Sequence, residues 1–285
     1  MHKNKYFPLL LITPFIIFFV LFRLLPILFT AITSVVDFNN ADMNLVFFDN
    51  IKSMINDNVF WKSIINTLLI FIFYIIIKFL FIFFIANLLE DVRRKRLVLL
   101  FLYLPTLVGL FAYAIIFKYV FTYQGVINNF IEMTFGFRID WFGSSLGSRI
   151  MISIATLWGS AGFYVLIYIN ALKNIPKSYE EVLILNGGNT IDRLRFVQIP
   201  LTLPVLKTIV FLSVVEMIAL IEIPMNLTLG NPNQSTITLS YYVYIQAIQY
   251  GNFSYAAMLG LVIMIIGFIF YFVRKPKGEF IYEVN

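Results

Sequence analysis

The sequence contains no cysteine, and its single histidine is at position 2. Without cysteine the chain has no disulfide, no thiolate ligand for zinc and no ligand for an iron–sulfur cluster, and one histidine cannot form a bis-histidine haem or zinc site. Redox and metal-dependent hydrolytic chemistry are therefore disfavoured. The nucleotide-binding pattern G-x-x-x-x-G-K-[ST] is also absent, so any ATP that drives this protein must be bound by another chain.

Charged residues are also scarce. They make up 13% of the chain, whereas a soluble globular domain carries about a quarter. Apolar residues make up 60% and include 32 Phe, many of them in long runs with Ile and Leu. One aqueous core cannot hide so many apolar side chains, so we expect lipid to solvate much of the chain.

Six segments are long and apolar enough to cross a bilayer, because about 20 helical residues span its hydrocarbon core of about 30 Å. They cover approximately residues 8–36, 63–89, 97–121, 150–172, 205–229 and 253–273. The first has no small-residue cleavage site, so we interpret it as a span and not as a cleaved signal peptide. The sequence therefore predicts an all-α polytopic membrane protein with a single transmembrane domain over residues 1–285.

The basic residues of the connections indicate which way the spans point, since Lys and Arg are enriched on the cytoplasmic side. Fourteen fall on one side: Lys3, Lys5, Arg93, Arg94, Lys95, Arg96, Lys173, Lys177, Arg193, Arg195, Lys207, Arg274, Lys275 and Lys277. The other side has four, which are Lys52, Lys62, Arg138 and Arg149. This distribution predicts a multi-pass protein of the cell membrane with both termini in the cytoplasm. It explains the net charge of +6 by topology and by attraction to membrane lipid, without nucleic-acid binding.

The connection over residues 175–204 is the one long polar stretch on the predicted cytoplasmic side. Ser178 precedes Glu181 by three residues, the capping-box spacing, so we expect a short helix to begin there. Gly187 and Gly188 follow and permit the positive φ that ends helices. A second short helix is expected before the fifth span, which gives a helix-turn-helix knob on the cytoplasmic face.

This connection resembles the EAA motif of ABC importer permeases. That family's pattern reads E-A-A, two more residues, D-G-A and a downstream I-x-L-P. Glu181, Gly187 and Pro200 match it, whereas Asn186 replaces Asp. Three alanines are also replaced, by Val182, Leu183 and Gly188.

The resemblance extends along nearly the whole chain, to the first permease subunit of carbohydrate importers of the maltose and glycerol-phosphate type. Its other matching segments run from Pro8 to Pro14, Pro26 to Ile32, Tyr103 to Pro105, Gly125 to Asn128, Asp140 to Trp141, Leu157 to Trp158 and Thr228 to Pro232.

The resemblance implies a transport subunit without enzymatic activity of its own. The loop would be a coupling helix in which Glu181, Asn186, Gly187 and Gly188 contact an ATPase. The implied partners are a second related permease, two ATP-binding subunits that hold ATP and Mg, and an extracytoplasmic solute-binding protein. The implied substrate is a sugar or oligosaccharide, and no cofactor is expected in this chain.

Charged residues inside the spans need an explanation, because an unpaired charge in hydrocarbon costs several kcal/mol. They are Arg23, Lys78, Glu216 and Glu222, the last of them one turn before Asn226. Two interpretations remain open. These residues form ion pairs between spans, or some of them line a pathway for sugar.

Two other classes of polytopic membrane protein would show different features. A secondary transporter for a small polar solute is the first alternative, and it would show inverted repeats and broken helices in place of a docking loop on one side. A membrane enzyme is the second, and it would need catalytic groups gathered at one depth. Glu181 also has a simpler interpretation, in which it only caps the helix together with Ser178.

Overall fold

The structure is a computed structural model that describes residues 7–37, 44–90 and 95–273. Both chain ends lie outside these ranges, so the predicted cytoplasmic position of the termini concerns residues outside the described part. The same holds for the basic residues Lys3, Lys5, Arg93, Arg94, Arg274, Lys275 and Lys277.

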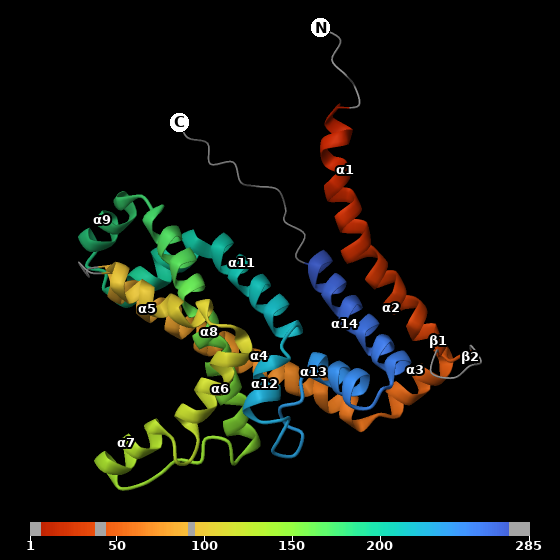
Figure 1. Cartoon of the computed structure of the whole chain (residues 1–285). Helices are drawn as coiled ribbons and strands as arrows, with labels where there is room; N and C mark the ends of the chain where they lie inside the picture. The colour runs from red at the N-terminus through yellow and green to blue at the C-terminus, as the bar shows by residue number, and fades with distance from the viewer. Residues whose placement is uncertain (1–6, 38–43, 91–94, 274–285) are drawn as a thin grey trace. The chain divides into compact units, whose positions relative to one another are not determined.

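The described ranges are almost entirely helical (Figure 1). One short antiparallel pair, β1 (Val36–Asp37) and β2 (Asn44–Leu45), aligns Val36 with Leu45. The α-helices are α1 (Phe7–Phe19), α2 (Leu25–Val35), α3 (Phe47–Asn56), α4 (Asn58–Glu90), α5 (Lys95–Leu107), α6 (Leu110–Phe121), α7 (Val126–Phe135), α8 (Ser145–Lys173), α9 (Lys177–Leu185), α10 (Thr190–Asp192), α11 (Ile199–Ile218), α12 (Glu222–Leu227), α13 (Leu239–Tyr244) and α14 (Phe253–Val273). Three π-helical segments join neighbouring helices, namely η1 (Val20–Leu24), η2 (Arg193–Gln198) and η3 (Ile245–Gln249).

Six helical stretches of the described chain are long and apolar enough to cross a membrane. They are Leu11–Val35, Asn58–Leu89, Leu110–Phe135, Ser145–Lys173, Thr190–Ile218 and Phe253–Phe272. The predicted all-α polytopic fold with six spans is therefore confirmed, although several boundaries differ.

The third predicted span, residues 97–121, is not one helix. α5 ends at Leu107, Gly109 is extended with φ −57° and ψ 143°, and α6 begins at Leu110. Pro105 lies inside α5 near its end, where it has no N–H to donate to the preceding turn. The apolar composition continues through the break, so composition alone could not show it.

The fifth predicted span, residues 205–229, also ends early, because α11 stops at Ile218 and α12 begins at Glu222. Pro224 explains the break, since in a continuous helix its ring would clash with the carbonyl of Leu220, four residues earlier. The carbonyl of Leu220 instead accepts a hydrogen bond from the Thr238 hydroxyl at 2.6 Å, and that of Ile218 accepts one from Ser240. Hydroxyl groups of the following segment thus satisfy the carbonyls that the helix end leaves free.

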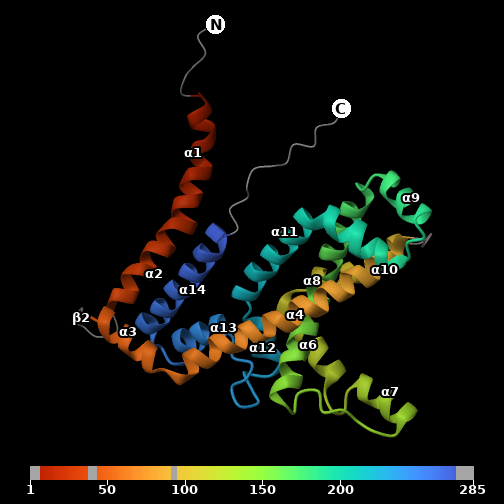
Figure 2. The same ribbon diagram turned by 180° about the vertical axis from the view of Figure 1, so that it is seen from behind.

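The chain forms two compact units, residues 1–60 with 242–285 and residues 61–241. In the first unit α2 packs along α14, and both views show the two helices side by side (Figure 1 and Figure 2). Buried Asn50 of α3 joins them, because its Nδ2 donates to the Ser34 carbonyl at 3.1 Å and to the Ser254 hydroxyl at 2.9 Å. The prediction of a single transmembrane domain stays a prediction.

Asp57 connects three segments of the same unit. Its Oδ1 accepts hydrogen bonds from the backbone N–H groups of Val59 at 2.8 Å and Phe60 at 3.2 Å, at the start of α4. Its Oδ2 accepts hydrogen bonds from the hydroxyls of Tyr242 and Tyr255. Burial raises the pKa of Asp57, but these four hydrogen bonds lower it further, so the pKa lies below its usual value.

The second unit contains the larger core. α5 packs on α8, α12 on α6, and α11 on α8 (Figure 1). Side chains of α4, α8 and α11 fill the interior, and its fully buried members include Ile70, Tyr74, Ile82, Ile152, Val165, Tyr168 and Ile209. This packing places two groups of functional candidates in one unit: the charges of α4 and α11, and the loop between α8 and α11.

Candidate functional site

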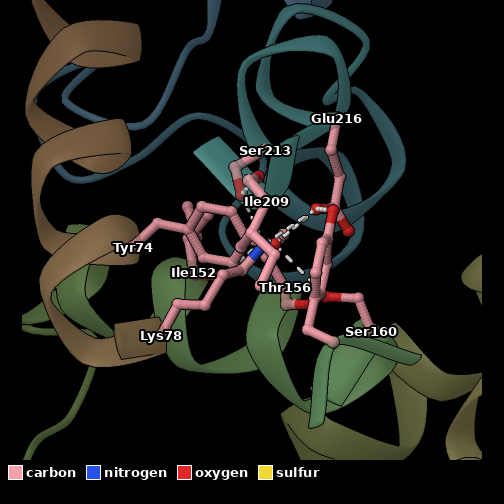
Figure 3. Close-up of polar contacts among 9 residues, drawn as sticks. Tyr74, Lys78, Ile152, Thr156, Ser160, Ile209, Ser213 and Glu216 are labelled. Carbon is pink, nitrogen blue, oxygen red and sulfur yellow. Dashed lines mark hydrogen bonds and ion pairs between the residues drawn. The ribbon is translucent and has the colours of Figure 1, made fainter. Parts of the chain in front are cut away.

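Lys78 of α4 and Glu216 of α11 form an ion pair in the interior of the second unit. The Lys78 Nζ lies 3.3 Å from Glu216 Oε2, and it donates a hydrogen bond to the Ser213 hydroxyl at 2.7 Å. The Lys78 side chain is fully buried, whereas that of Glu216 is 28% exposed. Figure 3 shows the three side chains converging from the two helices.

Two tyrosines complete this cluster. The hydroxyls of Tyr74 and Tyr164 both donate to Glu216 Oε2, the latter at 3.0 Å. The Lys78 Nζ also lies over both rings, 4.0 Å from the Tyr74 centroid and 3.4 Å from the Tyr164 centroid. Ring faces stabilise a cation that has lost its water, so a buried lysine is held by a carboxylate, a hydroxyl and two rings.

The charge-bearing residues of this cluster were identified from the sequence, but its neutral members were not. Tyr74 precedes Lys78 by four residues and Ser213 precedes Glu216 by three, the spacings that place two side chains on one face of a helix. These spacings could have identified Tyr74 and Ser213 from the sequence as neighbours of the two charges. Tyr164 lies on α8 and could be found only from the packing of α8 against α4 and α11.

The other candidates inside the predicted spans do not join the cluster. Arg23 lies in η1 of the first unit, with its side chain exposed. Glu222 begins α12, and the Asn226 amide donates to the Glu222 backbone carbonyl at 2.7 Å. Glu222 and Asn226 therefore belong to the short helix that follows the break after α11.

The loop between α8 and α11 begins with α9, two residues earlier than a capping box with Ser178 as its N-cap predicts. Pro176 is the residue before the helix, and no side chain caps its start, so the predicted pairing of Ser178 with Glu181 is wrong. Pro176 has φ −61° and ψ 136°, so its backbone is extended, as is usual for the residue that precedes a helix. A capping box is present further on, where Asn189 and Asp192 bond each other's backbone N–H groups at the start of α10.

The second short helix expected in the loop is not separate from the fifth membrane span. The helical stretch that starts at Thr190 continues through η2 and α11 to Ile218. Pro200 lies in the first turn of α11, and Pro204 lies inside it. The helix after the turn is thus continuous with a membrane helix, so a movement of the turn can act directly on that helix.

The turn itself has the geometry that its glycines predict. Gly187 has φ +72°, in the left-handed region. Its N–H donates to the Ile184 carbonyl and that of Gly188 to the Leu183 carbonyl, both at 2.9 Å, which is the Schellman pattern of a helix end. The Asn186 amide also donates to a carbonyl of α9, that of Val182, at 2.7 Å.

Two departures from the EAA pattern compensate each other at this turn. A Cβ atom on residue 188 would lie 2.6 Å from the side chain of Leu183 and 3.0 Å from its carbonyl oxygen. Leu183 and Gly188 both stand where the pattern has alanine. The larger residue at 183 therefore fits because residue 188 has no side chain.

An ion pair that the sequence analysis did not identify links the two sides of the loop. Glu180 Oε1 accepts hydrogen bonds from Arg193 Nε, at 3.1 Å, and from its Nη2. The pair closes a cavity of about 100 Å³ whose apolar walls come from α4 and α8, with Ala86, Leu89, Ile169 and Leu172. This ion pair connects α9 to the first residue of η2.

Glu181 differs from its neighbour Glu180. It is exposed, and among the described residues it makes no ion pair or hydrogen bond. Large apolar side chains surround it on the same loop, including Ile184 at 71% exposed and Leu185 at 85%. We call this surface the loop patch, and it consists of Tyr179, Val182, Ile184, Leu185, Ile191 and Phe196.

Residues 79–275 match the family of binding-protein-dependent transport system inner membrane components. This match covers most of the chain and includes α8, the loop, the loop patch and α11. The chain therefore belongs to this family and is a multi-pass membrane protein of a binding-protein-dependent transport system.

Two curated relatives are similar over nearly the whole chain. The lactose transport system permease protein LacF of Rhizobium radiobacter is 30% identical and is aligned over 94% of each chain. The arabinooligosaccharides transport system permease protein AraP of Bacillus subtilis is 24% identical, over 93% of this chain and 86% of its own.

A solved structure has the same fold. A chain of a bacterial alginate ABC transporter, in complex with a periplasmic protein that holds an alginate pentasaccharide, superposes with a TM-score of 0.79. It is 18% identical and covers 95% of this chain and 93% of its own length. At this identity the likeness establishes the fold.

Proposed function

We propose that this chain is the permease subunit that forms one half of the translocation pathway of an ATP-driven importer for a sugar or oligosaccharide. A second related permease forms the other half, two partner subunits bind and hydrolyse ATP with Mg, and an extracytoplasmic protein delivers the solute. The chain itself acts as a transporter subunit and not as an enzyme. The observation that carries the proposal is the family match over residues 79–275, which includes the exposed loop.

The loop patch supports docking of an ATPase subunit. Exposed apolar residues at the tip of a rigid turn form a surface that a partner groove can cover. Glu181 lies within this surface without a partner among the described residues, so it is available to a basic residue of the docked subunit. The Schellman turn and the Glu180–Arg193 pair hold the patch in a fixed orientation relative to α11.

The relatives support a carbohydrate as the solute. LacF is named for lactose, AraP for arabinooligosaccharides, and the solved neighbour belongs to an alginate transporter. These solutes include neutral and acidic sugars. The class of solute is therefore proposed as carbohydrate, without a choice between a neutral and an acidic one.

The partner is tested by capture of the ATP-binding subunit on the tagged chain from solubilised membranes. Glu181→Lys is expected to reduce the captured ATPase strongly, because it replaces the unpaired carboxylate with a like charge for a basic partner. Asp49→Lys is the matched control, since Asp49 is an exposed acidic residue of α3 in the other unit. Equal capture by both variants would contradict docking through Glu181.

The solute is tested with the extracytoplasmic solute-binding protein that the proposal pairs with this chain. Its binding to a panel of neutral sugars, uronic-acid oligosaccharides and sugar phosphates is measured, and uptake of the best ligand is then measured in cells with and without this chain. We expect a carbohydrate ligand whose uptake requires the chain. A receptor that binds only amino acids or peptides would contradict the sugar assignment and leave the family membership intact.

A further inference from the structure

Helix α7 carries an apolar stripe that the rest of its unit leaves uncovered. Val126, Phe130, Met133 and the following Phe137 are 70%, 64%, 89% and 54% exposed. Val126, Phe130 and Met133 are spaced by four and three residues, so they line one side of α7, and Phe137 lies just after the end of the helix at Phe135. α7 begins after a turn at residues 122–125, and Figure 1 shows it turned aside from the line of α6.

The orientation of this stripe is fixed by contacts on the other side of α7. Asn128 is fully buried, and its Nδ2 donates to the carbonyls of Thr122 at 3.2 Å and Ile139 at 2.8 Å, while its Oδ1 accepts from the Ile139 N–H at 3.0 Å. Gly125 allows the close turn before α7, since a Cβ there would lie 2.5 Å from the Val120 carbonyl oxygen. The exposed stripe is therefore held in place by the fold.

We propose that α7 lies in the membrane–water interface, at the end of the bundle where α6 ends and α8 begins, with its stripe inserted between lipid headgroups and acyl chains. α7 has ten residues, too few to cross a bilayer by itself, and the turn at residues 122–125 separates it from α6 within the apolar stretch Leu110–Phe135. An amphipathic helix with Phe and Met on one side is suited to lie in the plane of the interface. This inference concerns lipid contact and does not depend on which solute is carried.

Continuity with the membrane-embedded surface identifies lipid as the occupant. α6 presents exposed Ile116 and Tyr119 in the turns that lead to α7, so an apolar surface extends from a membrane span directly to the stripe. Tyr119 and Tyr123 are exposed at this level, where tyrosine is enriched in membrane proteins. The nearby charges, Glu132 and Arg138, neutralise each other at 2.6 Å.

A docking site for the solute-binding protein is the competing occupant of the stripe. Interfaces that form and dissociate in water are about as polar as the rest of a protein surface. The four stripe residues contain no polar group. Lipid therefore fits the stripe better than a partner that must also leave it exposed to water.

The test uses the absence of cysteine from this chain, which allows one label at one chosen position when the partner subunits are also free of cysteine. Phe130→Cys and, separately, Met133→Cys are labelled with the fluorophore NBD in the complete transporter. The transporter is then placed in vesicles of phosphatidylethanolamine and phosphatidylglycerol, with or without phosphatidylcholine brominated near the carbonyl end of its acyl chains. Gln124→Cys, an exposed polar position of the turn before α7, is the matched control.

We expect the labels at positions 130 and 133 to emit at shorter wavelength than the label at 124 and to lose intensity on brominated lipid. Added solute-binding protein should leave both signals unchanged. Water-like emission without quenching at 130 and 133 would overturn the proposal. So would a shift to shorter wavelength that brominated lipid does not quench, or one that requires the solute-binding protein, since each would mean that protein covers the stripe.

Discussion

At the scale of single residues, Lys78 shows how a charge is kept inside a membrane protein. Its side chain is fully buried, and Glu216, Ser213 and two tyrosine rings surround it. Removing one partner of a buried pair leaves the other charge uncompensated, which costs about 3 to 5 kcal/mol, whereas replacing both is often close to neutral. The effect of a substitution at Lys78 on stability should therefore depend on whether Glu216 keeps its charge.

Lys78→Met is expected to lower the thermal unfolding midpoint of the purified transporter by an amount that corresponds to several kcal/mol. Lys78→Met combined with Glu216→Gln should restore most of the loss, because both charges are then absent. Lys207→Met, at an exposed lysine of α11, is the control and should change the midpoint little. If the double variant is as unstable as the single one, the pair is not the source of the stability.

Asp57 makes the first unit sensitive to acid. Its pKa is lower in the folded state than its usual value of 3.8, because its hydrogen bonds outweigh burial. A lowered pKa contributes stability that is present above the unfolded pKa and is lost as the pH falls through the folded pKa. We expect the unfolding midpoint of the wild type to fall more steeply below about pH 4 than that of Asp57→Asn.

The same variants separate the two roles of Asp57. Asn can still cap α4 through its Oδ1, so Asp57→Asn should keep the bonds to Val59 and Phe60 and weaken those to the tyrosines. Asp57→Ala loses both sets and should cost a further 1 kcal/mol or so at neutral pH, measured by chemical or thermal unfolding. Identical pH profiles for wild type and Asp57→Asn would contradict the assigned role of this carboxylate.

The role of a single residue can be predicted from the sequence when its neighbours along the chain are enough to indicate it. A charge inside an apolar span marks Lys78 and Glu216 from sequence alone, because hydrocarbon penalises it. Their pairing depends on how α4 and α11 are aligned, and the sequence of neither helix contains that information. The compensation between Leu183 and Gly188 is likewise visible only when the turn brings residues five apart into contact.

At the scale of elements, the loop between α8 and α11 was predicted in outline and corrected in detail. The glycine turn was predictable because only a residue without Cβ adopts its φ easily. The predicted start of α9 is wrong because the Ser178–Glu181 spacing also occurs when Ser178 lies inside the first turn, two positions after Pro176. The breaks within the third and fifth spans were missed because apolar composition hides a proline whose effect is on the backbone.

The Glu180–Arg193 pair connects α9 to the start of η2, so we expect the two elements to move together. Either Glu180→Arg or Arg193→Glu alone should break the ion pair. The double variant exchanges the two charges and should restore an ion pair between the same positions. We therefore expect each single variant to reduce ATPase activity stimulated by the solute-binding protein severalfold while the ATPase subunit stays bound. The double variant should recover a large part of that activity.

A matched control for the Glu180–Arg193 pair is Lys177→Glu with Ser178→Arg, a pair of charge changes at exposed positions of α9 outside the loop patch. It alters the loop surface without touching the Glu180–Arg193 contact. Loss of the bound ATPase in the Glu180→Arg or Arg193→Glu variant would assign the pair to docking. Unchanged stimulated activity in both single variants would show that the pair does not transmit movement.

At the scale of the whole molecule, composition was sufficient for the class of fold. The long apolar runs predicted six spans because a helix is the simplest way to satisfy the backbone in lipid. The order of motifs along the chain predicted the family, which the match over residues 79–275 confirms. The packing of α8 between α5 and α11 was not predictable, since spans of similar composition can be arranged in many ways.

The side of the membrane on which each loop lies follows from one helix in the second unit. α8 has 29 residues, and at 1.5 Å per residue it is about 43 Å long, enough to cross a bilayer once. The loop patch follows its C-terminal end, while α7 and its following turn precede its N-terminal end. α7 and α9 must therefore lie on opposite sides, and the basic residues favour the cytoplasm for α9.

Single cysteines test this orientation without background labelling, because the chain has none of its own. A membrane-impermeant thiol reagent added to intact cells should label Asn129→Cys, in α7, and should label Lys177→Cys, in α9, only after the membrane is permeabilised. Both positions are exposed, so accessibility within the protein does not limit either reaction. The reverse pattern would place the loop patch outside the cell, where no ATP-binding subunit could reach it, and would contradict ATP-driven import through this loop.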